Sequence, residues 1–153
     1  MNDMLSTGYP DPTANKAIAN VMREAKEKAY RPLTYIASPF AGDTVLNIER
    51  ARRYCIFATS QGRIPVAPHL LYPQFLDDGD RKQRELGLFF ALVLLGKCDE
   101  LWIFGSTVSC GMASEIVKAK RRGMPIRYFN DACEEVPDYG KQTKESNART
   151  DQF

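Results

Sequence analysis

Residues 100–129, ELWIFGSTVSCGMASEIVKAKRRGMPIRYF, decide the fold that we expect for this chain. The stretch begins with one short apolar run, ELWIF, and ends with another, PIRYF. Between the two runs lie a loop of small residues and a helical pattern that a glycine closes. A strand, a helix and a second strand in this order form a right-handed βαβ unit with parallel strands. The stretch therefore predicts an α/β fold.

The same alternation precedes this stretch. Strand patterns lie at 33–37 (LTYIA) and 64–67 (IPVA), and helical patterns lie at 47–61 and 81–96. Apolar runs flanked by Gly and Pro are typical of strands buried on both faces of a sheet. The sequence predicts a flavodoxin-like or Rossmann-like parallel sheet of four to five strands flanked by helices. We expect a long loop at 68–80, which contains two prolines and three aspartates.

The chain divides into three expected segments. Residues 1–32 would form a loose arm and a helix over 13–29, whose narrow apolar stripe would pack weakly on its own domain or against a partner chain. Residues 33–129 would form the folded domain. Residues 130–153 are polar and are expected to form a flexible tail with a docked start.

Composition excludes several classes of protein. The 153 residues carry a formal net charge of +2, which argues against a nucleic-acid partner. No apolar run is long enough to span a bilayer, so we expect no membrane partner. The N-terminus lacks the basic and apolar regions of a secretory signal, and we therefore expect a cytoplasmic protein. Residues 33–129 carry a net charge of +4, which agrees with a small anionic ligand.

No metal or organic cofactor is expected. The four cysteines form no CxxC pair and the chain has a single histidine, so the usual ligand pattern of a zinc site is missing. The sequence contains neither a GxGxxG nor a Walker motif. The cysteines are expected to be free thiols in a reducing compartment.

The loop after the first expected strand, SPFAGD, offers one candidate ligand site. In an open parallel sheet, ligands bind outside the carboxyl ends of the strands. Ser38 supplies a hydroxyl, Gly42 allows close backbone approach, and the helix that carries Asn47 presents free N–H groups that suit an anion. The alternative is an ordinary strand-to-helix turn with Asp43 or Thr44 as the helix N-cap.

The loop after the third expected strand offers a second candidate. Gly105, Ser106, Ser109 and Gly111 would form a cradle of small and hydroxylated residues before a helix. Glu115 would lie in the first turn of that helix, where a carboxylate stabilises the helix dipole without any function. The functional reading is a carboxylate that faces a ligand, and position alone does not separate the two.

Other side chains at this sheet edge also have two readings. His69 could be a catalyst or a structural hydrogen-bonding group. Asp78 and Asp80 could act as acid and base or bind a cation, or they could belong to a solvated acidic turn. Phe40 and Met112 could line a base or sugar pocket or pack in the core.

Several of these motifs resemble a known family. YIASPF (35–40) with the following Asn47, CDELWIFG (98–105) and SCGMASEIVKAKRRGMPIRYF (109–129) are similar to the nucleoside 2-deoxyribosyltransferase-like superfamily, in particular its small bacterial and phage members. The resemblance covers 33–129 and neither end of the chain.

The resemblance implies a reaction. Members cleave or exchange the N-glycosidic bond of a nucleoside or its monophosphate, and their catalytic glutamate corresponds to Glu115 here. The carboxylate attacks or stabilises the anomeric carbon, while a second acid protonates the departing base. The resemblance also implies ligand-binding roles for Tyr35, Ser38 and Phe40, and a homo-oligomer.

The chain departs from the family pattern at two places. Ala113 and Ser114 separate Glu115 from the Gly-Met step, which lies closer to the glutamate in catalytic relatives. The helix before the third strand normally carries an acid, but residues 90–92 (FAL) contain none. An acid from the preceding region would replace it, with Asp78, Asp80 and Glu85 as the candidates.

Three functions follow as hypotheses: an N-glycosidic hydrolase or (deoxy)ribosyltransferase, a non-catalytic nucleotide-binding protein of the same fold, and a scaffold that associates through the helix at 13–29. The candidate catalytic residues are Glu115, Asp78 and Asp80. The candidate substrate-binding residues are Tyr35, Ser38, Phe40, Gly42, Asn47, His69, Gly105, Ser106, Ser109, Gly111 and Met112.

Overall fold

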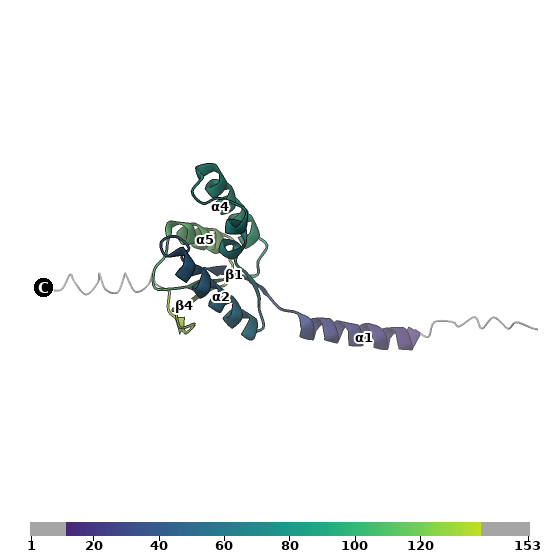
Figure 1. Ribbon diagram of the computed structural model, residues 1–153. Helices are drawn as coiled ribbons and strands as arrows, with labels where there is room; N and C mark the ends of the chain where they lie inside the picture. Colours follow the sequence, from purple (N-terminus) through teal and green to yellow (C-terminus); the bar gives the residue numbers. More distant parts are fainter. Residues whose placement is uncertain (1–11, 139–153) are drawn as a thin grey trace, which may run out of the picture. The chain divides into compact units, whose positions relative to one another are not determined.

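Strands and helices alternate along residues 12–138, which are the residues that the computed structural model describes (Figure 1). The predicted arm before residue 12 and the tail after residue 138 lie outside them. The chain divides into two units, Met1–Arg31 and Pro32–Phe153. The described part of the first unit is a single helix, α1 (Pro12–Ala29), close to the predicted helix at 13–29.

The second unit is built on a five-stranded sheet in the order β2-β1-β3-β4-β5. The first four strands are parallel to their neighbours, and β5 pairs antiparallel with β4. The predicted α/β fold of four to five strands is confirmed. The strands are β1 (Leu33–Ala37), β2 (Ile64–Val66), β3 (Glu100–Phe104), β4 (Ile126–Phe129) and β5 (Glu135–Val136).

Helices cover both faces of this sheet (Figure 1). They are α2 (Thr44–Ser60), α3 (Pro68–Leu71), the 3₁₀ helix η1 (Tyr72–Gln74), α4 (Arg81–Leu95) and α5 (Cys110–Arg121). β1 has β2 as its neighbour on one side and β3 on the other, so the chain adds strands first to one side of β1 and then to the other. The carboxyl ends of β1 and β3 therefore form a topological switch point, where ligands bind in open α/β sheets.

Alternation along the strands produces two separate cores. Tyr35 and Ala37 of β1 face one side, where they pack with residues of α4 and α5 such as Leu95 and Met112. Ile36 faces the other side, where it packs with α2 and with the fully buried Trp102. The pleat thus separates the α4 and α5 face from the α2 face.

One expectation about a loop is wrong. The predicted loop at 68–80 contains α3 and η1, each of which has a proline in its first turn, because proline fits that position without losing a hydrogen bond. The predicted tail, for which we expected a docked start, contains strand β5 near that start, and Glu135 of β5 forms an ion pair of 2.7 Å with Arg127. Among the described residues, no helix is both long and apolar enough to cross a bilayer.

Candidate functional site

A cleft of about 650 Å³ lies at the carboxyl end of the sheet, on the face covered by α4 and α5. Its walls come from the end of β1 and the loop that follows, from α3 and η1, from α4, and from the start of α5. The structure brings nine predicted site residues together in this cleft. They are Tyr35, Ser38, Phe40, His69, Asp78, Ser109, Gly111, Met112 and Glu115.

Tyr35 and Glu115 form the closest polar contact in this cleft. The Tyr35 hydroxyl donates a hydrogen bond of 2.5 Å to Oε1 of Glu115, from β1 to α5. Burial raises the pKa of Glu115 to about 7, and the hydrogen bond from Tyr35 acts in the opposite direction. Burial and the neighbouring Glu115 raise the pKa of Tyr35 far above its usual range, so Tyr35 stays a proton donor. Near pH 7 the carboxyl group can therefore exist in both protonation states.

Of the two readings of Glu115, the one that places it in the first turn to stabilise the helix dipole is wrong. The helix begins at Cys110, two residues earlier than the predicted helix, so Glu115 lies in the second turn. The N-cap is Ser109, whose hydroxyl accepts the hydrogen bond of the Met112 N–H at 3.2 Å. Because the macrodipole effect falls off within the first turn, it does not explain a carboxylate at position 115.

Ser38 and His69 form a second polar pair in the cleft. Ser38 Oγ lies 2.9 Å from His69 Nε2, and this contact joins the end of β1 to α3. Burial lowers the pKa of His69 to about 4, so the imidazole is neutral near pH 7. A neutral ring can accept the Ser38 proton or donate to its oxygen, and either bond fixes the hydroxyl at the rim of the cleft.

The acidic turn before α4 separates into two roles. Asp78 lines the cleft and lies 4.0 Å from the Arg84 guanidinium, and both side chains are exposed. Asp80 is the N-cap of α4, where its Oδ1 accepts from the backbone N–H of Lys82 at 2.9 Å. Asp80 does not line the cleft.

The apolar part of the cleft wall comes from the loop after β1, from α4 and from α5. Met112 is almost fully buried and belongs to the core as well as to the cleft wall. Phe40 is half-buried in the loop after β1. Ala91 and Leu92 of α4 also line the cleft, so the stretch that lacks an acid does face the candidate site.

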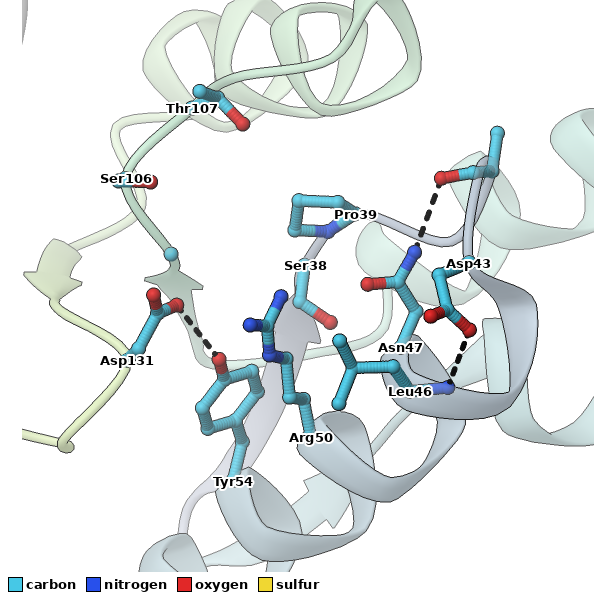
Figure 2. A pocket seen from close by; sticks show the side chains of 12 residues that line it. Ser38, Pro39, Asp43, Leu46, Asn47, Arg50, Tyr54, Ser106, Thr107 and Asp131 are labelled. Atoms are coloured by element: carbon cyan, nitrogen blue, oxygen red, sulfur yellow. Dashed lines mark hydrogen bonds between the residues drawn. The ribbon is translucent and has the colours of Figure 1, made fainter.

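A second, smaller pocket of about 270 Å³ lies on the α2 face, and we call it the α2 pocket (Figure 2). Asn47, Gly105 and Ser106 line this pocket and not the cleft, while Ser38 lines both. The Asn47 amide donates to the carbonyls of Phe40 and Ala41, at 3.0 Å each, and so holds the loop after β1.

Gly42 lines neither cavity. It has a φ of +97°, which favours glycine and shapes the loop. Asp43 is the N-cap of α2, as one of the two predicted alternatives had it, and it accepts from the Leu46 N–H at 3.1 Å.

Several lining residues were absent from the predicted site, and four of them have polar or charged side chains at prominent places. Tyr72 and Arg84 line the cleft, and Arg50 and Tyr54 line the α2 pocket. Arg50 and Tyr54 lie one helical turn apart in a segment that reads as an ordinary amphipathic helix, so periodicity gave no signal for them. In the residues that the structure describes, no group of three or more His, Cys, Asp or Glu could hold a metal ion.

The fold is similar to that of a known enzyme, and part of the sequence matches a known family. The chain is similar to a solved 2-deoxyribosyltransferase from the psychrotolerant bacterium Bacillus psychrosaccharolyticus, with 19% identity and a TM-score of 0.51 over 68% of this chain and 76% of that one. At this identity the likeness shows a distant relationship of fold. No curated protein matches the chain. A family profile matches residues 32–129, and on that match the chain belongs to the family described as "Domain of unknown function (DUF7768)".

Proposed function

We propose that this chain is an enzyme that hydrolyses or exchanges the N-glycosidic bond of a nucleoside or nucleotide, with Glu115 as the nucleophile. The observation that carries the proposal is the 2.5 Å contact between Tyr35 and Glu115 inside the cleft. Glu115 is a half-buried carboxyl group that accepts a hydrogen bond from a tyrosine hydroxyl. It lies at the carboxyl end of a parallel sheet, and this position supports attack on a bound sugar. The fold relationship to a 2-deoxyribosyltransferase supports the same reading.

The proposed reaction has two steps. In the first, a Glu115 carboxylate oxygen bonds to the anomeric carbon while the bond to the base nitrogen breaks, and the electron pair leaves with the base. A second acid gives that nitrogen a proton. In the second step, water or another base attacks the anomeric carbon, the second acid takes back a proton from the attacking molecule, and Glu115 leaves as a carboxylate.

Asp78 is the proposed acid. Its support is its position on the cleft wall, where a departing base could reach it. Asp80 has less support, because its carboxylate is engaged with the backbone at the start of α4. Arg84 lies beside Asp78 and supplies a positive charge for an anionic substrate such as a nucleoside monophosphate.

Substrate contacts are proposed for the residues that line the cleft. The hydroxyl of Ser38, held by His69, would accept or donate a hydrogen bond to the sugar. Phe40 and Met112 would contact the base, and the start of α5 at Ser109 and Gly111 would receive polar sugar oxygens. Asn47, Gly105 and Ser106 have no such support, because they line the α2 pocket instead.

A homo-oligomer and a cytoplasmic location also belong to the proposal. Phe75 and Phe89 near the cleft are 62% and 61% exposed, and apolar surface of this kind supports an interface. Cys55, Cys98, Cys110 and Cys133 are free thiols, which supports a reducing compartment.

The test is base release from a panel of nucleosides and nucleoside monophosphates, followed by chromatography. We expect Glu115→Gln, which keeps the shape of the side chain, to lower the rate about a thousandfold or more. The matched control is Glu49→Gln on the exposed surface of α2, which lines neither cavity and should keep the full rate. Equal rates in the wild type and Glu115→Gln would overturn the assignment of the nucleophile.

A non-catalytic nucleotide-binding protein is the second candidate. The specific observation in its favour concerns the α4 residues in the cleft wall, among them Ala91. None of these lining residues is an acid that could protonate a base. A nucleotide that raises the melting temperature and is recovered intact after long incubation would favour this candidate. Release of free base by the wild type would exclude it.

A further inference from the structure

The α2 pocket is separate from the cleft because it lies on the opposite face of the sheet. Its walls come from α2 and from the loops that follow β1, β3 and β4. Ser38, Pro39 and Ala41 line both cavities, so the loop after β1 forms part of the wall of each. The α2 pocket also lies at the topological switch point, the general position of ligands in open α/β sheets.

Arg50 supplies the charge of this pocket. Figure 2 shows its side chain extending from α2 between Tyr54 and Leu46 toward the loop that carries Ser38 and Pro39. The side chain is half-buried, and in the part of the chain that the structure describes it forms no ion pair or hydrogen bond. A guanidinium is always charged, and partial burial without an anion costs free energy. Arg50 thus gives the pocket a half-buried positive charge that an anionic ligand would neutralise.

Two carboxylates share the pocket with Arg50, yet neither is its partner. Asp43 Oδ1 accepts the Leu46 N–H at the start of α2. Asp131 Oδ1 accepts the Tyr54 hydroxyl at 3.2 Å, a contact drawn in Figure 2. Each carboxylate keeps a second oxygen, so the pocket offers hydrogen-bond acceptors beside a cation.

The remaining polar groups suit the same kind of ligand. Ser106 and Thr107 are exposed hydroxyl residues on the β3 side of the pocket. The Asn47 amide nitrogen is engaged with the loop, and its oxygen faces the pocket in Figure 2. Hydroxyl donors next to Arg50 fit an oxyanion, whereas the acceptor oxygens fit hydroxyl hydrogens.

We propose that the α2 pocket is a second ligand site, which binds a small sugar phosphate with its phosphate on Arg50 and its hydroxyls toward Asp131 and Asn47. Inorganic phosphate pairs only with Arg50, and the two carboxylates of the pocket repel it. A neutral sugar leaves Arg50 without an anion. This proposal does not depend on catalysis in the cleft, because neither proposed catalytic residue, Glu115 or Asp78, lines the α2 pocket.

The experiment is titration of the full-length protein with ribose 5-phosphate, followed by calorimetry and by amide NMR shifts. We expect binding that shifts residues of α2, with weaker binding of inorganic phosphate and weaker still of ribose. Arg50→Gln should weaken ribose 5-phosphate binding about tenfold to a hundredfold, since it removes a charge-assisted pair. Arg50→Lys should keep part of the affinity, because it retains the charge without the planar fork.

Two control variants make the outcome specific. Arg52→Gln and Arg121→Gln remove exposed cations of α2 and α5 that line neither cavity, so both should bind as the wild type does. The proposal fails if the wild type does not bind ribose 5-phosphate at millimolar concentration. It also fails if Arg84→Gln, which removes the cation of the cleft, weakens binding while Arg50→Gln does not, or if ribose or inorganic phosphate binds as tightly. Thermal melting of each variant verifies that it is folded.

Discussion

At the scale of single residues, the closest polar contact of the cleft joins positions that are 80 residues apart in the sequence. Tyr35 belongs to β1 and Glu115 to α5, and the pleat of β1 turns the Tyr35 side chain toward the face of the sheet that α5 covers. Burial makes the carboxylate form of Glu115 less stable, while the tyrosine hydroxyl stabilises it. The hydrogen bond therefore partly offsets the effect of burial and increases the ionised fraction of Glu115 near pH 7.

Replacing Tyr35 with Phe should shift the pH profile of the proposed reaction. The hydrogen bond lowers the pKa of Glu115 from the value that burial alone would give, so its removal raises that pKa. A nucleophile must be ionised, and the rate should fall at pH 6 and recover only at higher pH. A hydrogen bond to a charged group contributes about 1.5–3 kcal/mol, which corresponds to a shift of about one to two pH units.

The measurement is base release from pH 5 to 9 for the wild type and Tyr35→Phe. Tyr72→Phe serves as a control, since Tyr72 also lines the cleft but donates no recorded hydrogen bond to Glu115. An acidic limb at the same pH in all three proteins, with only the maximum rate changed, would show that Tyr35 does not set the ionisation of Glu115.

At the scale of elements, the start of α4 tests whether an acidic residue serves structure or chemistry. Asp80 accepts from the backbone N–H groups of Lys82 and Gln83. We expect Asp80→Ala to lower the free energy of unfolding by about 1 kcal/mol, because it removes an N-cap. Asp80→Asn should keep most of the stability, since Asn also caps helices well.

Denaturant unfolding measures the first effect, and base release by the same two variants measures the second. A residue that only caps α4 leaves base release unchanged in both variants at temperatures where they are folded. Loss of base release in Asp80→Asn, with stability preserved, would assign Asp80 and not Asp78 as the acid. Equal stability of Asp80→Ala and the wild type would contradict the cap.

The strands and helices also show which sequence patterns predict an element correctly and which do not. The runs at 33–37 and 100–104 form strands over the residues predicted, because the sheet buries both faces of a short apolar segment. Pro68 and Pro73 suggested a loop, yet each stands in the first turn of a short helix. Two residues, 135–136, are too few for any periodic signal, so β5 depends on pairing with β4.

At the scale of the whole molecule, one polar edge of the sheet serves two cavities. Loops after β1 and β3 were predictable as ligand loops from topology, since the carboxyl ends of parallel strands lie together. Which face each loop residue lines was not predictable, because Ser106 and Ser109 lie three positions apart and line different cavities. Arg50 had no signal either, because its role depends on the loops that surround it.

The division into two units predicts that the second unit folds without the first. Removing residues 1–31 should leave the melting temperature within about 2 °C of the full chain, since a larger shift corresponds to a loss of roughly 0.5 kcal/mol or more. The reason is that the two described core clusters draw all their members from between Tyr35 and Val136. In α1, by contrast, Ile18 and Met22 are 58% and 68% exposed. Thermal melting with size-exclusion chromatography measures both stability and assembly. A truncated chain that melts well below the full one, at equal protomer concentration, would show that the first helix stabilises the α/β unit.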